Sequence, residues 1–300
     1  MSVRKKLRAL LSDPELLVLP GAYDGLSARI IEAQGFKGVL AGGYAGIGSM
    51  LAEPDIGQSN MRDYAEHYAR ICGAVQLPVS VDADTGFGEV HNVRQTVRAF
   101  EAAGVAALTI SDQVFPNRCG YLPGKQVVPV EQMLAKIKSA VDARRDQDLI
   151  IVGRTDCASI LGFDEAIDRC HLFLEAGADM VKPMGADKLD DIERLVREVK
   201  SPIQATMSQA AGVHRTTFAQ LQERGVAAVG LPSIALFAAA RAVTDVLMQI
   251  KRDKSLAGIV SHVLPLDDYY KLVGLEAAWS REQKLIEEAR ALVDRFKARE

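Results

Sequence analysis

Short apolar runs alternate with stretches of helical periodicity from near the start of the sequence to about residue 251. The apolar runs occupy residues 16–20, 38–43, 78–84, 107–112, 149–156, 179–183, 202–208 and 227–232. Each run is apolar almost throughout, which is typical of parallel strands covered on both faces. The segments between them, such as 93–104 and 164–177, carry apolar residues at helical spacing. The pattern therefore predicts strand–helix units repeated along the chain.

Four of the predicted helices end in a glycine that leads directly into the next strand, namely Gly35, Gly104, Gly177 and Gly225. Glycine at this position takes the left-handed conformation that closes a helix without a steric penalty. Eight strand–helix units in succession favour a (β/α)8 TIM-type barrel. A doubly wound parallel sheet is the alternative that the pattern alone leaves open.

The alternation stops at about residue 251. We expect residues 1–251 to form the barrel domain, with a helix at its N-terminus, and residues 252–300 to form a C-terminal helical extension of it. The last twenty residues are a charged amphipathic helix without a strand partner. This tail either packs on the barrel exterior or docks on another subunit.

Composition excludes several classes of protein. Of 300 residues, 48% are hydrophobic and 25% charged, as in ordinary globular proteins. Because 36 basic residues face 39 acidic ones, we expect no nucleic-acid or membrane partner. No apolar run is long enough to span a membrane and no leader peptide is evident, so a cytoplasmic protein is expected. The four cysteines lack CxxC spacing and are expected to be free thiols.

In a barrel of this type, reactive groups gather at the carboxyl ends of the strands. Asp82 and Asp84 follow the third apolar run and precede a glycine-rich turn. On an extended strand end two such residues point the same way, and paired carboxylates suit a hard cation such as Mg2+. A solvated loop is the simpler interpretation, but the pair directly follows a buried strand, which favours a site.

Two further strand ends carry groups that bind anions. Arg154 and Asp156 end the fifth run, where an arginine offers a planar, two-pronged donor to a substrate carboxylate or phosphate. A structural ion pair is the alternative. After the second run, Gly42 and Gly43 offer backbone N–H groups to an anion, a weak signal when taken alone.

The connection after the fourth strand, residues 112–128, is long for a strand-to-helix loop, and such loops at a barrel mouth tend to be lids. Cys119 lies within it between Arg118 and Gly120, with Lys125 nearby. Because these basic residues favour the thiolate, we expect a lowered pKa for Cys119.

Taken together, these motifs resemble the isocitrate lyase and phosphoenolpyruvate mutase superfamily, particularly its 2-methylisocitrate lyase-like members. The resemblance runs from residue 19 to about 275. It rests on PGAYDGLSA, the GG at 42–43, Pro54-Asp55, VDADTGFG, DQVFPNRCG, the PGK of the lid and GRTD. It implies a Mg2+-dependent barrel that is usually a tetramer, a dimer of dimers that exchange their last barrel helices.

The resemblance also implies roles for matching residues. Asp82 would bind Mg2+ directly and Asp84 through water, with Asp55 close to them. Arg154 and the N–H groups at 42–43 would bind the substrate carboxylate. Cys119 would be the acid or base of the lid. The full set of expected site residues also includes Lys182 and Tyr121 as catalytic groups, and Tyr44, Gly120 and Thr206 as substrate contacts.

Several positions depart from the family pattern. The substitutions are Ser111 and Met184 for the usual glutamates, Tyr121 for a lid histidine, Ala41 for serine, Thr206 for asparagine and Lys182 for an apolar residue. Two carboxylates fewer and one ammonium more make the expected site more positive. This change predicts weak Mg2+ binding, with Lys182 partly replacing the cation or forming a Schiff base with a keto acid.

The favoured function is therefore a Mg2+-assisted lyase that breaks a C–C bond in a small 2-hydroxy or 2-keto di- or tricarboxylic acid through an enolate-like intermediate. Cys119 favours this reading, because relatives that act on P–C bonds commonly lack the lid cysteine. The departures argue against isocitrate or 2-methylisocitrate as the substrate. A phosphonate mutase or hydrolase, and a barrel that binds a small acid without turning it over, are the alternatives.

Overall fold

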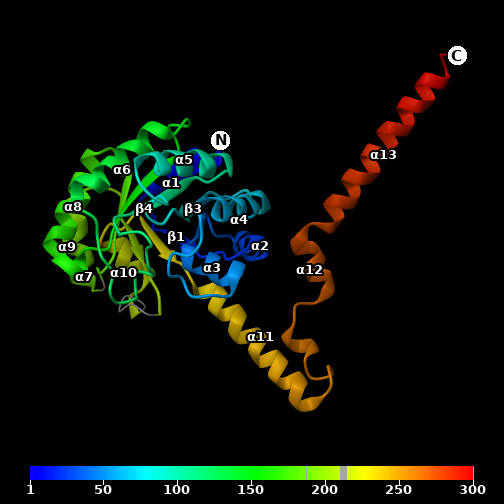
Figure 1. Ribbon diagram of the computed structural model, residues 1–300. Coiled ribbons are helices and arrows are strands. Elements are labelled where there is room, and N and C mark those ends of the chain that lie inside the picture. Colours follow the sequence, from blue (N-terminus) through cyan, green and yellow to red (C-terminus); the bar gives the residue numbers. More distant parts are fainter. Residues whose placement is uncertain (187, 210–214, 300) are drawn as a thin grey trace. The chain divides into compact units, whose positions relative to one another are not determined.

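The computed structural model describes residues 1–186, 188–209 and 215–299 (Figure 1). By internal packing the chain divides into two compact units, Met1–Ala239 and Ala240–Glu300. The boundary expected at residue 251 falls inside helix α11 (Ile234–Asp253) and stays a prediction.

All eight predicted strands are present in the first unit. They are β1 (Leu17–Pro20), β2 (Val39–Ala41), β3 (Val79–Asp82), β4 (Ala107–Ser111), β5 (Ile150–Thr155), β6 (Met180–Pro183), β7 (Gln204–Thr206) and β8 (Ala228–Leu231). They pair in parallel, as β2-β3-β4-β5-β6 and as β1-β8-β7.

Isolated parallel bridges join these two ladders. One links Gly21 to Leu40, beyond β1 and in β2, and the other links Val181 of β6 to Ile203 beside β7. Because the first strand pairs with the last and the bridges connect both seams, the sheet closes on itself. The closed order confirms the (β/α)8 barrel and excludes the doubly wound sheet.

Helices follow the strands in the predicted alternation (Figure 1). They are α2 (Gly25–Ala33), α3 (Gly43–Leu51), α4 (Met61–Ala74), α5 (Val90–Ala102), α6 (Val130–Ala143), α7 (Ala158–Leu161), α8 (Phe163–Glu175), α9 (Leu189–Val199) and α10 (Phe218–Glu223), with α11 after β8. The four glycines expected to close helices all have positive φ, between 76° and 103°. That prediction is confirmed.

The predicted N-terminal helix, α1 (Val3–Leu11), covers the amino-terminal end of the barrel. Leu7 and Leu11 pack in one buried cluster with residues of six strands, including Leu19 of β1 and Met180 of β6. Arg8 of the same helix forms an ion pair with Asp179, at 2.9 Å. Because apolar packing closes this end of the barrel, we expect the active site at the other end, where the carboxyl ends of the strands lie.

In the residues described, the regular structure of the second unit is helical, as expected for the tail. It contains the end of α11, a short 3-10 helix (Val260–His262), α12 (Leu266–Val273) and α13 (Leu275–Lys297). Exchange of the last barrel helix between subunits stays a prediction. In the described part of the chain, no helix is both long and apolar enough to cross a membrane.

Candidate active site

A cavity of about 310 Å³ opens at the carboxyl ends of the strands. Its lining includes eleven of the twelve residues expected in the site: Gly42, Gly43, Tyr44, Asp55, Asp82, Cys119, Gly120, Tyr121, Arg154, Lys182 and Thr206. The twelfth, Asp84, is buried beside Asp82. The structure therefore brings the expected residues together, and their individual roles remain predictions.

Asp55, Asp82 and Asp84 form what we call the acidic wall. We expected Asp82 and Asp84 to lie on an extended strand end, and this is wrong. Strand β3 ends at Asp82, and Asp84 has a φ of +47°. The left-handed turn lets the Asp84 N–H donate to Asp82 Oδ1 at 3.0 Å. A Cβ placed on Gly43 would lie 3.3 Å from Asp84 Oδ1 and 3.7 Å from Asp82 Oδ2, so both carboxylates still approach Gly43.

The carboxylates of the acidic wall disfavour one another's charge. Burial, and next the charge of Asp82, raise the pKa of Asp55 to about 6. The same two causes raise the pKa of Asp84 well above its usual range. Asp84 accepts a 2.9 Å hydrogen bond from Asn117 Nδ2, whereas the buried Oδ1 of Asp55 has no partner among the described residues. The wall thus holds more negative charge than the neighbouring donors offset.

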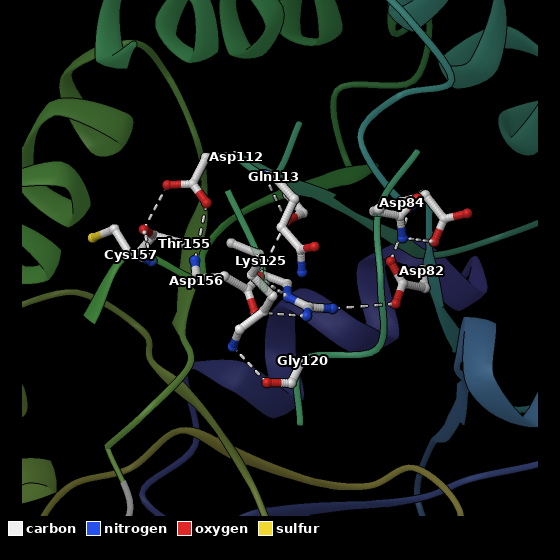
Figure 2. A network of polar contacts seen from close by, with 12 residues as sticks. Asp82, Asp84, Asp112, Gln113, Gly120, Lys125, Thr155, Asp156 and Cys157 are labelled. Carbon is white, nitrogen blue, oxygen red and sulfur yellow. Dashed lines mark hydrogen bonds and ion pairs between the residues drawn. The ribbon is translucent and has the colours of Figure 1, made fainter. Parts of the chain in front are cut away.

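Arg154 and Lys182 form the basic wall, on the neighbouring strands β5 and β6. Arg154 donates from Nε and Nη2 to the two oxygens of Asp156, at 2.7 and 3.0 Å. Its Nη1 lies 3.5 Å from Asp82 Oδ2, which links the two walls (Figure 2). Lys125 of the lid also approaches Asp156, at 3.5 Å. Arg154 is therefore fixed by carboxylates and faces the cavity. It is both a member of an ion pair and a candidate hydrogen-bond donor to a substrate carboxylate.

Lys182 pairs in register with Arg154, which places the two on adjacent strands at one level of the barrel. The side chain is buried, with 7% of the residue exposed. Burial, and next the positive charge of Arg154, lower the pKa of Lys182 to about 8. Lys182 is thus an ammonium at neutral pH whose charge the fold disfavours.

The lid is held across the cavity by its own polar contacts. Cys119 N–H donates to the Asp55 carbonyl at 3.3 Å. Figure 2 shows the second contact, in which Lys125 Nζ donates to the Gly120 carbonyl. Gln113 and Arg118 exchange two 3.0 Å hydrogen bonds within the lid. A Cβ on Gly120 would lie 2.8 Å from Arg154 Nη2, so this glycine permits the closest approach of the lid to the basic wall.

Cys119 lies between the two walls, and the expectation of a lowered pKa is wrong. Burial raises the pKa of its thiol, the carboxylates of Asp55 and Asp156 raise it further, and the backbone N–H of Tyr121 and the charge of Arg154 only partly oppose them. The sequence showed the basic neighbours in the lid, but not the carboxylates that the fold brings close. Cys119 is therefore a protonated thiol that can donate a proton.

Asp112 follows strand β4 but lies outside the acidic wall. It is fully buried and accepts hydrogen bonds from Thr155 Oγ1, the Asp156 N–H and Arg169 Nη1, at 2.6, 2.9 and 3.0 Å. Figure 2 shows it on the far side of the network from Asp82 and Asp84. This cluster is satisfied by protein partners and is structural.

Three residues of the site have contacts that the sequence alone did not predict. Asn117 orients Asp84, and Ser111, at a position where the family usually has glutamate, donates to Asp156 Oδ2 at 3.1 Å. Lys125 was noted only for its charge, yet it spans Gly120 and Asp156. The location of Asn117 inside the DQVFPNRCG motif and of Lys125 inside PGK was the available signal, since residues within a specific motif commonly support its reactive groups.

A magnesium ion fits the acidic wall. No group of three His, Cys, Asp or Glu side chains forms a compact metal cluster among residues 1–186, 188–209 and 215–299. However, Mg2+ keeps most of its waters and is commonly bound through one or two carboxylates. A cation bound beside these carboxylates would give Asp55 Oδ1 a partner and would offset the charges that raise the pKa of Asp55 and Asp84.

A family model described as phosphoenolpyruvate phosphomutase matches residues 7–251. The chain belongs to this family. Among its curated relatives, 2,3-dimethylmalate lyase of Eubacterium barkeri is 34% identical over 92% of this chain and 96% of the relative. 2-Methylisocitrate lyase of Aeropyrum pernix is 37% identical over 96% of this chain and 93% of the relative.

Solved structures of the phosphoenolpyruvate phosphomutase family agree with this assignment. Oxaloacetate acetylhydrolase bound to 3,3-difluorooxaloacetate superimposes with a TM-score of 0.89 at 29% identity, covering 95% of this chain and 97% of that one. Phosphonopyruvate hydrolase bound to oxalate and Mg2+ superimposes with a TM-score of 0.86 at 28% identity, covering 95% and 100%.

This member of the family is accordingly an enzyme of the lyase and mutase superfamily, and the binding-only alternative is set aside. Lyases are among the similar proteins, and so is a phosphonopyruvate hydrolase. Which substrate the cavity takes depends on the residues that line it in this chain.

Proposed function

We propose that the enzyme is a magnesium-assisted lyase that cleaves a C–C bond in a small 2-hydroxy or 2-keto carboxylic acid. The observation that carries the proposal is the position of the protonated Cys119 thiol, which lines the cavity from the lid and lies between the acidic and basic walls. A cavity of about 310 Å³ suits a substrate of a few carbons.

The substrate carboxylate would bind between Arg154 and the start of α3. Gly42 is the N-cap of α3 and Gly43 its first residue, so their N–H groups lie at a helix N-terminus, where anions are stabilised. Arg154 is held by Asp156 and so meets the carboxylate without first having to be ordered. Tyr44, Gly120 and Thr206 complete this part of the lining.

Asp82, with Asp84 and Asp55 behind it, would hold the magnesium ion. When bound there, Mg2+ supplies Lewis-acid stabilisation of negative charge developing on substrate oxygens. The protein keeps three carboxylates close together at this point at the cost of raised pKa values for Asp55 and Asp84.

Cys119 would supply the proton that the cleavage requires. In a 2-hydroxy acid, a carboxylate of the acidic wall would accept the hydroxyl proton, and the C–O bond would become a carbonyl as the adjacent C–C bond breaks. The electron pair stays on the other fragment as an enolate, and the thiol proton goes to its carbon. A raised pKa for the thiol keeps this proton in place until the carbanion develops.

The lining argues for a substrate other than isocitrate or 2-methylisocitrate. Tyr121, Met184 and Thr206 all line the cavity at positions where the lyases resembled carry different residues, and Lys182 adds a charge. Met184 is an apolar side chain that packs near Gly120. These differences leave the cleavage groups in place and change what surrounds the rest of the substrate.

A substrate panel tests the proposal. The enzyme with Mg2+ is incubated with 2,3-dimethylmalate, 2-methylisocitrate, malate, oxaloacetate and phosphonopyruvate, and keto acids, other carboxylic acid products and phosphate are all quantified. We expect C–C cleavage products from a hydroxy or keto acid, and their loss in EDTA. Phosphate release from phosphonopyruvate without C–C cleavage would instead establish the phosphonate hydrolase or mutase that the structural similarity also suggests.

The assembly and location are further parts of the proposal. We expect a homo-oligomer, a dimer of dimers, working in the cytoplasm without nucleic-acid or membrane partners. Exposed large apolar side chains on α13, including Trp279, Leu285 and Phe296, support association with another subunit. Light scattering of the full chain should give the mass of four subunits, and a monomer at micromolar concentration would contradict this.

A further inference from the structure

The turn that follows β3 has a backbone conformation that few residues favour. Within residues 84–88, two residues other than glycine have positive φ, namely Asp84 at 47° and Phe87 at 58°. A left-handed conformation is unfavourable for a residue with a side chain and persists where the surrounding structure fixes it. This turn carries Asp84 of the acidic wall and comes directly after Asp82, the last residue of β3. The contacts that fix the turn therefore also place these two carboxylates.

Helices α4 and α6 each provide a buried donor to a main-chain carbonyl of this segment. Tyr68 of α4 donates from Oη to the Asp82 carbonyl at 2.8 Å. Lys136 of α6 donates from Nζ to the Thr85 carbonyl at 3.3 Å. The two carbonyls lie on either side of Asp84 in the sequence. Side chains from two different helices thus hold the backbone before and after this left-handed residue.

Lys136 occupies a place where a charge is unfavourable. Only 2% of the residue is exposed, and burial lowers the pKa of its ammonium, which Glu89 only partly opposes. Glu89 Oε1 is 3.9 Å away on a side chain that is 63% exposed, so it offsets little of the charge. Met133 and Ile137 of the same helix are buried and apolar, so an apolar residue would serve packing as well. Packing does not explain the charge, whereas the bond to the Thr85 carbonyl does.

We propose that Tyr68 and Lys136 are positioning residues that hold the acidic wall in the geometry that binds Mg2+. The inference rests on the proposed function, in which Asp82, Asp84 and Asp55 hold the ion. Tyr68 and Lys136 are not in the lining of the cavity, so they do not touch the substrate. Each acts through a main-chain carbonyl, which fixes the direction of the Asp82 and Asp84 side chains.

Two substitutions remove a donor and little else. Tyr68→Phe deletes one hydroxyl and keeps the ring, which packs edge-to-face against Phe100. Lys136→Met keeps an unbranched side chain and deletes the ammonium. Mg2+ is titrated by calorimetry into each full-length variant in saturating oxalate, and urea unfolding is measured on the same samples. We expect each variant to bind Mg2+ roughly tenfold to hundredfold more weakly, as is common when a group that orients a metal ligand is lost. Oxalate binding without Mg2+ should not change.

Ser139→Ala is the matched control. Ser139 is buried on the same helix as Lys136 and donates from Oγ to the Val90 carbonyl at 2.7 Å, beyond the turn. Its substitution removes a buried hydrogen bond of the same kind, so Mg2+ affinity should stay at the wild-type value even if stability falls. Lys136→Arg keeps a cationic donor and should recover part of the affinity lost in Lys136→Met. If Lys136→Met does not fold, Lys136→Gln replaces it.

A purely structural role would give a different result. Variants of Tyr68 and Lys136 that lose stability in urea but bind Mg2+ as tightly as the wild-type enzyme would overturn the inference. Equal weakening of Mg2+ binding in Ser139→Ala would overturn it as well, and so would an equal loss of oxalate binding without Mg2+.

Failure of the proposed magnesium site gives a separate pattern. If the wild-type enzyme binds no Mg2+ even in oxalate, the magnesium site is wrong and the inference fails with it. If the wild-type enzyme binds Mg2+ and the two variants bind it equally well, the site stands and only the role of Tyr68 and Lys136 is wrong.

Discussion

The acidic and basic walls face each other across one cavity, and each carries charge that the protein does not fully neutralise, negative on one wall and positive on the other. On the acidic side, Asp55 has a buried oxygen without a partner in the described structure, and its pKa is raised to about 6. On the basic side, Lys182 has its pKa lowered to about 8. Each wall destabilises its own charge, and Arg154 links the two walls directly, with its Nη1 3.5 Å from Asp82 Oδ2.

The contrast with the Asp112 cluster shows why this imbalance matters. Asp112 is as deeply buried, yet it has hydrogen bonds from Thr155, Asp156 and Arg169. Burial alone therefore does not leave charges unsatisfied in this protein. A carboxylate-rich wall suits a cation and an ammonium suits an anion, so the two walls together suit a metal-bound carboxylic acid.

The largest effect is expected at Cys119, between the walls. Cys119→Ser should lower kcat for C–C cleavage by roughly 10²- to 10⁴-fold, because the proton donor is lost, while oxalate affinity stays the same. Steady-state kinetics and calorimetry measure the two quantities. Cys72→Ser, on α4 away from the cavity lining, is the matched control. Undiminished activity in Cys119→Ser would show that another group moves the proton.

A smaller loss of activity is expected when the lid is prevented from packing against the basic wall. Gly120→Ala places a Cβ about 2.8 Å from Arg154 Nη2, so the lid must shift outward. We expect kcat/KM to fall roughly 10- to 100-fold, because displacing groups by about an ångström has effects of that size. Gly73→Ala on α4 is the control, since nothing lies within 4 Å of its added Cβ. Equal activity of the two variants would mean that the lid does not act by closing on Arg154.

The smallest effect is a gain in stability from removing the unpaired ammonium. The folded-state pKa of Lys182 is about 8 against 10.5 for the free side chain, because burial and Arg154 outweigh Asp82 and Asp156. Its cost to folding is thus fully present below pH 8 and disappears as pH rises through 10.5. Each unit of such a shift corresponds to about 1.4 kcal/mol, which gives about 3 kcal/mol as an upper figure.

Urea unfolding at pH 7 and pH 10 checks this prediction. Lys182→Met should be more stable than the wild-type enzyme at pH 7, and the difference should shrink at pH 10. Lys138→Met, exposed on α6, serves as the control for loss of a lysine. A Lys182→Met enzyme that is less stable at pH 7 would show that the protein itself supplies a favourable partner for the ammonium.

Much of the fold was predictable because its strands and helices follow from local sequence patterns. Long apolar runs and the helix-closing glycines predicted every strand of the barrel. Closure depended on contacts that no local pattern contains, such as the pairing of β1 with β8. The convergence of Asp82, Arg154 and Lys182 followed from the rule that parallel strands end on the same side.

The electrostatic details of the site were less accessible from sequence. The left-handed turn at Asp84 and the raised pKa of Cys119 depend on neighbours that only the fold defines. Asp112 looked like the other strand-end carboxylates, but its partners Thr155 and Arg169 lie 43 and 57 residues away. A sequence shows which charged groups are present, whereas their pairing is decided by tertiary contacts.

The central claim is that the two walls form a single site in which a cation and a carboxylic acid bind together. Calorimetric titration of Mg2+ into the enzyme, with and without saturating oxalate, tests it most directly. We expect weak Mg2+ binding alone and at least tenfold tighter binding with oxalate, with the reciprocal gain for oxalate. Tight Mg2+ binding that oxalate leaves unchanged would contradict the claim.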